Sequence, residues 1–348
     1  MTNTARIILI LALTFSLSAS LAWAEKAPLE FDAFDGQVIG ARAIGAGEAF
    51  TGLGSDASAP YWNPAGLALM SGNSFTMCSY LQRESSAKWE DVIKSDPLRG
   101  GKLAYLSFAA PNGALSIRPL SKIATDTYTH VNGVETWVNK KVIVNEIMLT
   151  TARKYQDNIY TGVSLNYLNS NLSIAQRTKD ASTDVTRINV DTGNGWSLDL
   201  GLVFVASPYL SFGVSAINAI GYMYWSDYDK NRLPLAFNSG VAMTLPQKVT
   251  FMFDIKRIYY PDHEDVITKH IGLEQYMFNM FTLRAGMSGE NWNDPDKVAY
   301  TFGVGFSENG YILDLAMRRN KIRDSEVPDR FATISVYVVS LSMPFGGN

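Results

Sequence analysis

The chain has 348 residues, of which 47% are hydrophobic, 12% aromatic and only 18% charged, and its net charge is −3. So small a charge argues against a nucleic-acid-binding surface, and a single cysteine excludes an internal disulfide framework. After the N-terminal segment no apolar run is long enough for a membrane helix. A role in a membrane must therefore rest on strands.

Residues 1–24 have the features of a secretory signal peptide. Arg6 supplies a positive start, Ile7–Leu17 an apolar stretch, and Ala22-Trp23-Ala24 a cleavage site of small residues. The apolar stretch is shorter than the ~18 residues of a membrane-spanning helix. We therefore expect cleavage before Glu25 and export from the cytoplasm.

The next segment, residues 25–71, is rich in glycine and lacks strand-like alternation. Almost everything behind it alternates. An irregular, glycine-rich head in front of a regular strand array predicts a plug, or hatch, that enters a barrel formed by residues 72–348.

The body of the chain contains about fourteen segments of roughly ten residues with strand-like alternation, the length that a tilted strand needs to cross a bilayer. The predicted strands are Asn73–Leu81, Lys102–Ala110, Ala114–Leu120, Lys141–Arg153, Asn158–Ser173, Gly195–Ala206, Tyr209–Ile220, Leu235–Leu245, Lys248–Ile258, Ile267–Met277, Asn279–Ser288, Lys297–Ser307, Gly310–Arg319 and Phe331–Met343.

The connections between these strands alternate between very short and long. The long, polar ones are 82–101, 121–140, 174–194, 221–234, 259–266, 289–296 and 320–330. Outer-membrane barrels have this asymmetry because their periplasmic turns are tight and their outer loops long, whereas a soluble β-sandwich has no reason for it. The sequence predicts an all-β fold, a transmembrane antiparallel β-barrel of about 14 strands with both termini on the periplasmic side.

The head segment can then be compared with known barrels. Gly40–Phe50 and Ser55–Leu67 resemble the start of the FadL-like outer-membrane family, with the PorV/PorQ branch and its GARA…YWNPAGL pattern most similar. Asn63-Pro64-Ala65 matches the hatch motif that this branch shares with FadL-type hydrophobe transporters. The chain departs from the pattern at Ser55-Asp56 and Glu48, where paired acids and a glycine are usual. It also carries its terminal phenylalanine early, at Phe345.

Residues of the motif are the candidate site. They are Arg42, Gly45, Gly47, Asp56, Tyr61, Trp62, Asn63, Pro64 and Ala65. Asn63 is expected to cap a short helix that begins at Pro64. We further expect Arg42, Glu48 and Asp56 to form salt bridges to the barrel wall. Pro119 is a candidate for a strand kink and lateral opening, because proline interrupts ladder hydrogen bonds.

Other chemistry is not indicated. The three histidines are scattered, so we predict no metal site, and neither a dinucleotide fingerprint nor a nucleophile motif is present. We expect no cofactor and no enzymatic activity. The basic run 318–323 is either a solvated loop or a contact with lipopolysaccharide phosphates.

Two functions follow from the resemblance. The first is a monomeric barrel in the outer membrane of a Gram-negative-type bacterium that passes small hydrophobic molecules through a plug-gated lumen or a side route. The second is a PorV-like component of a type IX secretion route, which docks or shuttles secretion-system proteins through loops 82–101 and 121–140. In both, the partners include outer-membrane lipid and exclude nucleic acid.

Overall fold

The computed structural model describes residues 39–84, 103–131, 134–180, 182–261, 264–323 and 331–346. The predicted signal peptide (1–24), the first part of the predicted plug (25–38) and most of the predicted loop 82–101 lie outside these residues.

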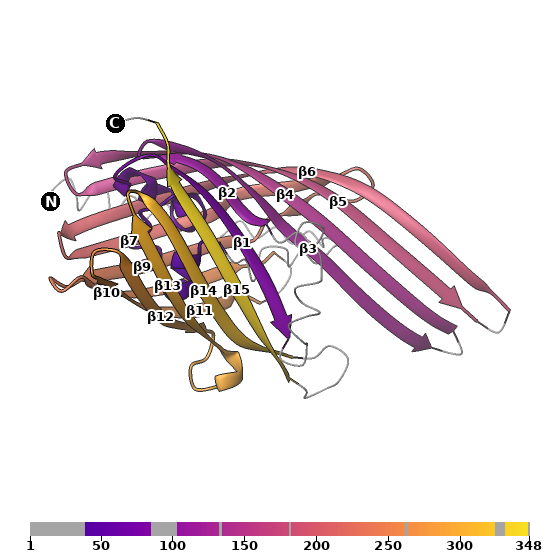
Figure 1. Ribbon diagram of the computed structural model, residues 1–348. Helices are drawn as coiled ribbons and strands as arrows, with labels where there is room; N and C mark the ends of the chain where they lie inside the picture. Colours follow the sequence, from indigo (N-terminus) through magenta and orange to yellow (C-terminus); the bar gives the residue numbers. More distant parts are fainter. Residues whose placement is uncertain are drawn as a thin grey trace.

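Three short helices in the head segment precede a long series of strands (Figure 1). The helices are α2 (Ala41–Gly45), α3 (Ala59–Trp62) and the 3-10 helix η1 (Pro64–Leu69). The strands are β1 (Ser74–Glu84), β2 (Leu103–Ala110), β3 (Gly113–Val131), β4 (Val134–Gln156), β5 (Ile159–Lys179), β6 (Asp184–Ser207), β7 (Leu210–Trp225), β8 (Asn231–Arg232), β9 (Leu235–Thr244), β10 (Val249–Tyr259), β11 (Val266–Met277), β12 (Phe281–Gly289), β13 (Val298–Glu308), β14 (Tyr311–Arg323) and β15 (Phe331–Pro344), with a 3-10 turn η2 (Pro295–Lys297) before β13.

The strands close into one antiparallel barrel. Each long strand pairs with the next along the chain, β7 passes over the two-residue β8 to pair with β9, and β1 pairs with β15 to complete the ring. The barrel wall therefore contains 14 strands, and the predicted fold class is confirmed. Both ends of the described barrel, Ser74 and Pro344, pair at the end where the short turns lie.

The wall has two heights. Strands β3 to β6 contain 19, 23, 21 and 24 residues, whereas β9 to β13 contain 9 to 12. Figure 1 shows these four strands running together well past the rest of the barrel. The prediction that 121–140 and 174–194 are loops is therefore wrong for most of both ranges. In 182–190 every residue is exposed, so polar residues occur on both faces, the usual alternation is absent and the strand resembles a loop in sequence.

The outer surface of the barrel is apolar, because alternate positions of each strand point outward and carry apolar side chains. Leu149, Leu165 and Phe253 expose 61%, 55% and 37% of their surface, whereas Thr150, Asn166 and Asp254 on the alternate positions are buried inside. Aromatic side chains mark both rims of this belt. The rim at the short turns contains the ring pairs Phe75–Phe108, Phe204–Phe212 and Phe281–Phe306, and the opposite rim contains Tyr167, Trp196, Tyr222 and Tyr224. Lipid-facing barrels have this arrangement.

The head segment fills the barrel interior near the short-turn end. Phe50, Ile44 and Leu67 are completely buried between the plug helices and the wall. No helix among the described residues is long and apolar enough to span a membrane.

Candidate functional site

Asn63 connects two segments of the plug to each other and to the barrel wall. Pro60 opens α3 and Pro64 opens η1, both at positions where the fixed φ of proline suits a helix start. The Asn63 Oδ1 accepts from the backbone N–H of Ala65 at 3.2 Å and so caps η1, in the geometry that the sequence predicts.

The amide nitrogen of Asn63 reaches in two further directions. Its Nδ2 donates to the carbonyl oxygen of Thr51 within the plug at 2.9 Å and to that of Leu202 in β6 at 3.1 Å. Asn63 is completely buried, so all of these bonds form away from bulk water. One side chain thus joins two plug segments and the wall.

A ring of glycines on the inner wall receives the plug backbone. The ring consists of Gly162, Gly201, Gly213, Gly240, Gly272, Gly286 and Gly303, one on each of seven strands. Three pairs of them, Gly162–Gly201, Gly213–Gly240 and Gly272–Gly286, lie directly opposite each other in the ladder. A Cβ added at any of them would overlap the plug or press against a neighbouring side chain. Without side chains at this level, the plug backbone lies directly on the wall.

The predicted residues Gly45, Gly47, Pro64 and Ala65 are the plug side of this contact. Gly47 has a φ of 71° and touches Gly286, while Gly45 lies against Gly303. The backbone N–H of Gly47 donates to Thr301 Oγ1 at 3.0 Å. Pro64 and Ala65 lie against Gly162 and Gly201 on the opposite wall.

A chain of charges holds the other side of the plug. Arg42 donates from Nε and Nη2 to the two carboxylate oxygens of Glu274, each at 2.9 Å. Glu274 also accepts from Arg284 at 2.7 Å, and Arg284 continues to Asp314 at 2.6 Å. Burial alone would lower the pKa of Arg42, but the facing Glu274 and Asp56 carboxylates outweigh burial and raise it, so the guanidinium stays charged.

Two of the three predicted plug-to-wall salt bridges form. Arg42 reaches Glu274 of β11, and Glu48 pairs with Arg318 of β14 at 3.3 Å. The prediction for Asp56 is wrong, because this carboxylate stays within the plug. It pairs with Arg42 at 3.5 Å and accepts from both the backbone N–H and the hydroxyl of Ser58, which holds the turn before α3.

Tyr61 and Trp62 form an aromatic pair on the plug. Their ring centroids are 4.8 Å apart in an edge-to-face arrangement, and the Arg118 guanidinium lies 4.8 Å from the Tyr61 centroid. The Trp62 carbonyl accepts from Ser215 Oγ at 2.8 Å. The Trp62 indole N–H is buried and has no hydrogen-bond partner among the described residues.

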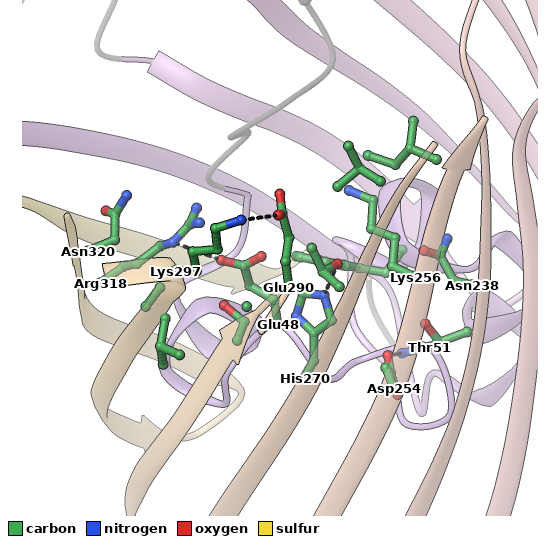
Figure 2. A pocket seen from close by; sticks show the side chains of 18 of the residues that line it. Glu48, Thr51, Asn238, Asp254, Lys256, His270, Glu290, Lys297, Arg318 and Asn320 are labelled. Atoms are coloured by element: carbon green, nitrogen blue, oxygen red, sulfur yellow. Dashed lines mark hydrogen bonds and ion pairs between the residues drawn. The ribbon is translucent and has the colours of Figure 1, made fainter. Parts of the chain in front are cut away.

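A cavity of about 520 Å³ opens above the plug, with Tyr61 and Trp62 among its lining residues. Figure 2 shows charged side chains from the β9–β14 side and the plug converging on it. Glu48–Arg318 and Lys297–Glu290 are paired, and His270 bonds the Gly47 carbonyl through Nδ1. Among the described residues no group of three or more His, Cys, Asp or Glu side chains is placed to hold a metal ion.

Pro119 lies in β3, at an irregular place in the wall beside the plug motif. The β3–β4 register shifts between Pro119 and Ser121. The β2–β3 pairing ends at Leu106–Ile117, although β2 extends back to Leu103 and β3 continues to Val131. The neighbouring Arg118 contacts Tyr61, so this irregularity lies beside the aromatic pair.

Sequence reasoning missed the wall half of the site. The glycine ring had a signal, because these glycines fall at inward-facing positions of strands where glycine is otherwise unfavourable. Glu274, Arg284 and Asp314 are single charges on three separate strands, and only the barrel register brings them together.

The site and the closed barrel define a plugged transmembrane β-barrel, and solved structures share this fold. No protein-family model and no curated protein matches the chain. The Ralstonia pickettii toluene transporter TbuX matches over 90% of this chain and 100% of its own, with 11% identity and a TM-score of 0.62. The Pseudomonas putida toluene transporter TodX also matches over 90% and 100%, with 14% identity and a TM-score of 0.56. A Pseudomonas aeruginosa FadL homologue matches over 87% and 98%, with 12% identity and a TM-score of 0.56.

Proposed function

We propose that this protein is an outer-membrane barrel that passes small hydrophobic molecules from its outer cavity to a side exit between β2 and β3. The observation that carries the proposal is the glycine ring. The plug backbone lies directly on the wall along these glycines, which belong to strands between β5 and β13, so a molecule entering from the outer cavity meets the plug on this side of the lumen. Unless the plug moves, the remaining way out is through the wall.

The wall is weakest beside the aromatic pair. Beyond Leu106–Ile117 the two strands do not pair, and Pro119 has no N–H to donate to a neighbour. On the inner side of this region, Tyr80, Ala104 and Tyr61 belong to one apolar cluster with the plug. A hydrophobic molecule leaving the cavity over Tyr61 would pass the Arg118 guanidinium, which is paired with Glu146. It would then reach this apolar cluster and the bilayer core rather than the periplasm.

The structural neighbours support the same class of function. Two of them are described as toluene transporters, and another, CymD, is described as a monoaromatic hydrocarbon channel, with 13% identity and a TM-score of 0.61. At this identity the likeness extends to the fold alone. The apolar ligand is therefore proposed from the Tyr61–Trp62 pair and the apolar cluster beside it, since the rest of the cavity lining is largely charged or polar.

The oligomeric state, the cellular location and the absence of enzymatic activity are part of the same proposal. The protein acts as a monomer in the outer membrane of a Gram-negative-type bacterium after signal-peptide cleavage, and it is not an enzyme. The PorV/PorQ likeness and a secretion role stay predictions from the sequence. The proposed contact loop 121–140 is mostly strand, and most of 82–101 lies outside the described residues.

Uptake of a long-chain apolar fluorescent probe into protein-containing vesicles tests the proposal. Pro119→Thr restores an N–H to β3 and removes the ring constraint, so we expect uptake to fall several-fold. Pro208→Ala, in the short turn between β6 and β7, is the matched control and should keep the wild-type rate. The double variant Trp62→Ala with Asn63→Ala tests whether the plug controls uptake, and we expect its rate of probe uptake to differ from that of the wild type.

The outcomes separate the parts of the proposal. Wild-type uptake no faster than in protein-free vesicles would sink the transport function. Normal uptake by Pro119→Thr, together with altered uptake by the plug variant, would replace the side exit with a route through the plug.

A further inference from the structure

The extension of β3–β6 beyond the rest of the barrel has an outer face that continues the lipid-facing surface. On β5 the exposed positions run without interruption from Val163, Leu165 and Tyr167 to Asn169 and Asn171. Tyr167 belongs to the outer aromatic rim. Whatever lies directly above the acyl chains of the outer leaflet therefore meets the residues that follow Tyr167.

The first row above the rim is made of asparagines. Asn145, Asn169 and Asn194 lie directly opposite one another on β4, β5 and β6. All three are exposed. Tyr167 Oη donates to Asn194 Oδ1 at 2.7 Å, and Asn169 Nδ2 donates to the same oxygen at 3.1 Å, so the row is fixed to the rim. The rest of these amides present both donors and acceptors outward.

An aromatic and basic row lies farther out on the same face. Tyr128, Trp137 and Arg177 are neighbours across β3, β4 and β5. The two rings have centroids 5.3 Å apart, and the Arg177 guanidinium lies 5.3 Å from the Trp137 centroid. Trp137 is eight residues from Asn145 along β4, about 26 Å at ~3.3 Å per residue.

We propose that this outer face binds the sugar portion of the glycolipid of the outer leaflet, lipopolysaccharide. Sugar hydroxyls need paired donors and acceptors, which the amide row supplies. The apolar faces of sugar rings need aromatic surface, which the exposed Tyr128 and the half-buried Trp137 supply. Lys141 on this face complements the phosphates of such a lipid, whereas Arg177 is paired with Asp184 at 2.6 Å and serves to position the Trp137 ring. The proposal rests on the outer-membrane orientation of the proposed function, and it assigns a partner that transport itself does not require.

The opposite face of the same strands provides the control. Thr136 and Gln176 lie on alternate positions of β4 and β5, on the side continuous with the lumen. A variant with Thr136→Ala and Gln176→Ala removes polar groups from the same strands without touching the outer face.

Native mass spectrometry of the detergent-solubilised protein measures binding of rough-form lipopolysaccharide, which has core sugars, and of lipid A, which lacks them. We expect Asn145→Ala with Asn169→Ala to weaken binding of the rough form about tenfold, as the loss of two hydrogen-bonding groups predicts. Trp137→Ala should weaken it similarly. The control variant should bind like wild type, and lipid A binding should be unchanged in Trp137→Ala, because Trp137 lies beyond the level of the lipid A headgroup. Heat-modifiable migration on gels checks that each barrel is folded.

Equal binding of the rough form by the wild type and both outer-face variants would overturn the proposal. So would an equal loss of lipid A binding in Trp137→Ala, because the contact would then not involve the core sugars. Probe uptake into vesicles free of lipopolysaccharide separates this test from the transport test: the outer-face variants should transport like wild type. Failure of uptake in every form would remove the transport function and leave the sugar-binding result intact.

Discussion

The two sides of the barrel hold the plug by different physical means. On the β11–β14 side, Arg42, Glu274, Arg284 and Asp314 form a continuous chain of opposite charges. On the β5–β6 side, Gly162 and Gly201 leave room for Pro64 and Ala65, and Asn63 supplies the hydrogen bonds. The charged side depends on every partner being present, and the glycine side depends on an empty volume. The two sides should therefore fail under different substitutions.

The reactivity of Cys78 toward a thiol reagent measures how firmly the plug is docked on both sides of the barrel. Cys78 is completely buried on β1 in the same cluster as Ile39 and Ala41 of the plug segment. A membrane-impermeant thiol reagent can reach it only when the plug opens, so the labelling rate follows the opening equilibrium. Each 1.4 kcal/mol of lost plug docking then corresponds to about a tenfold faster rate.

The largest effect is expected from Glu274→Ala. The change removes the carboxylate shared by Arg42 and Arg284, and breaking a buried ion pair costs about 3 kcal/mol or more. We predict labelling of Cys78 at least a hundredfold faster than in wild type. Glu290→Ala, whose partner Lys297 is half exposed, is the control and should label at the normal rate. A normal rate in Glu274→Ala would mean that the charged side does not hold the plug.

Gly201→Ala should come next. The added methyl group overlaps Asn63 Oδ1 and the Ala65 nitrogen, and such overpacking costs about 1–3 kcal/mol. We expect Cys78 labelling to accelerate by about tenfold or more. In Gly72→Ala the added carbon meets nothing within 4 Å, so this variant isolates the steric effect from glycine removal itself. Equal rates in the two variants would contradict the close fit.

Asn63→Ala should have an intermediate effect. It removes the cap on η1 and the bonds to Thr51 and Leu202, and it leaves two buried carbonyls with one bond fewer. A loss of about 1–2 kcal/mol predicts roughly tenfold faster labelling. Asn291→Ala, in an exposed turn, controls for asparagine removal. An unchanged rate for Asn63→Ala would show that glycine packing alone holds the β5–β6 side.

The smallest effect is expected from Lys297→Ala. Its ammonium lies 3.7 Å from Glu290, and both side chains are about half exposed at 55% and 51%. Exposed pairs of this kind contribute ~0–1 kcal/mol. Cys78 labelling should stay within about fivefold of wild type. A change comparable with that of Glu274→Ala would show that cavity charges far from the plug also control its docking.

The sequence predicts the membrane-spanning part of the wall well. Lys248–Ile258 is observed as Val249–Tyr259, because a strand with lipid on one side and a filled lumen on the other alternates clearly. The outer part of β6 was missed because residues 184–190 are exposed on both faces. Asn63 and Pro64 were predictable because capping is local. The Glu274–Arg284–Asp314 chain was not, since it depends on the register of three strands.

The contact between the plug and the barrel seam has a consequence for assembly. The backbone N–H of Ala41 donates to Ser340 Oγ at 2.8 Å, and Ser340 lies opposite Cys78 where β15 meets β1. The plug therefore contacts β15 where this strand pairs with β1, which is the pairing that closes the barrel. Seating the plug therefore stabilises the closed cylinder, and the earliest part of the chain contacts the latest. We accordingly expect a truncated protein without its head to accumulate less, and that loss would be no measure of an open pore.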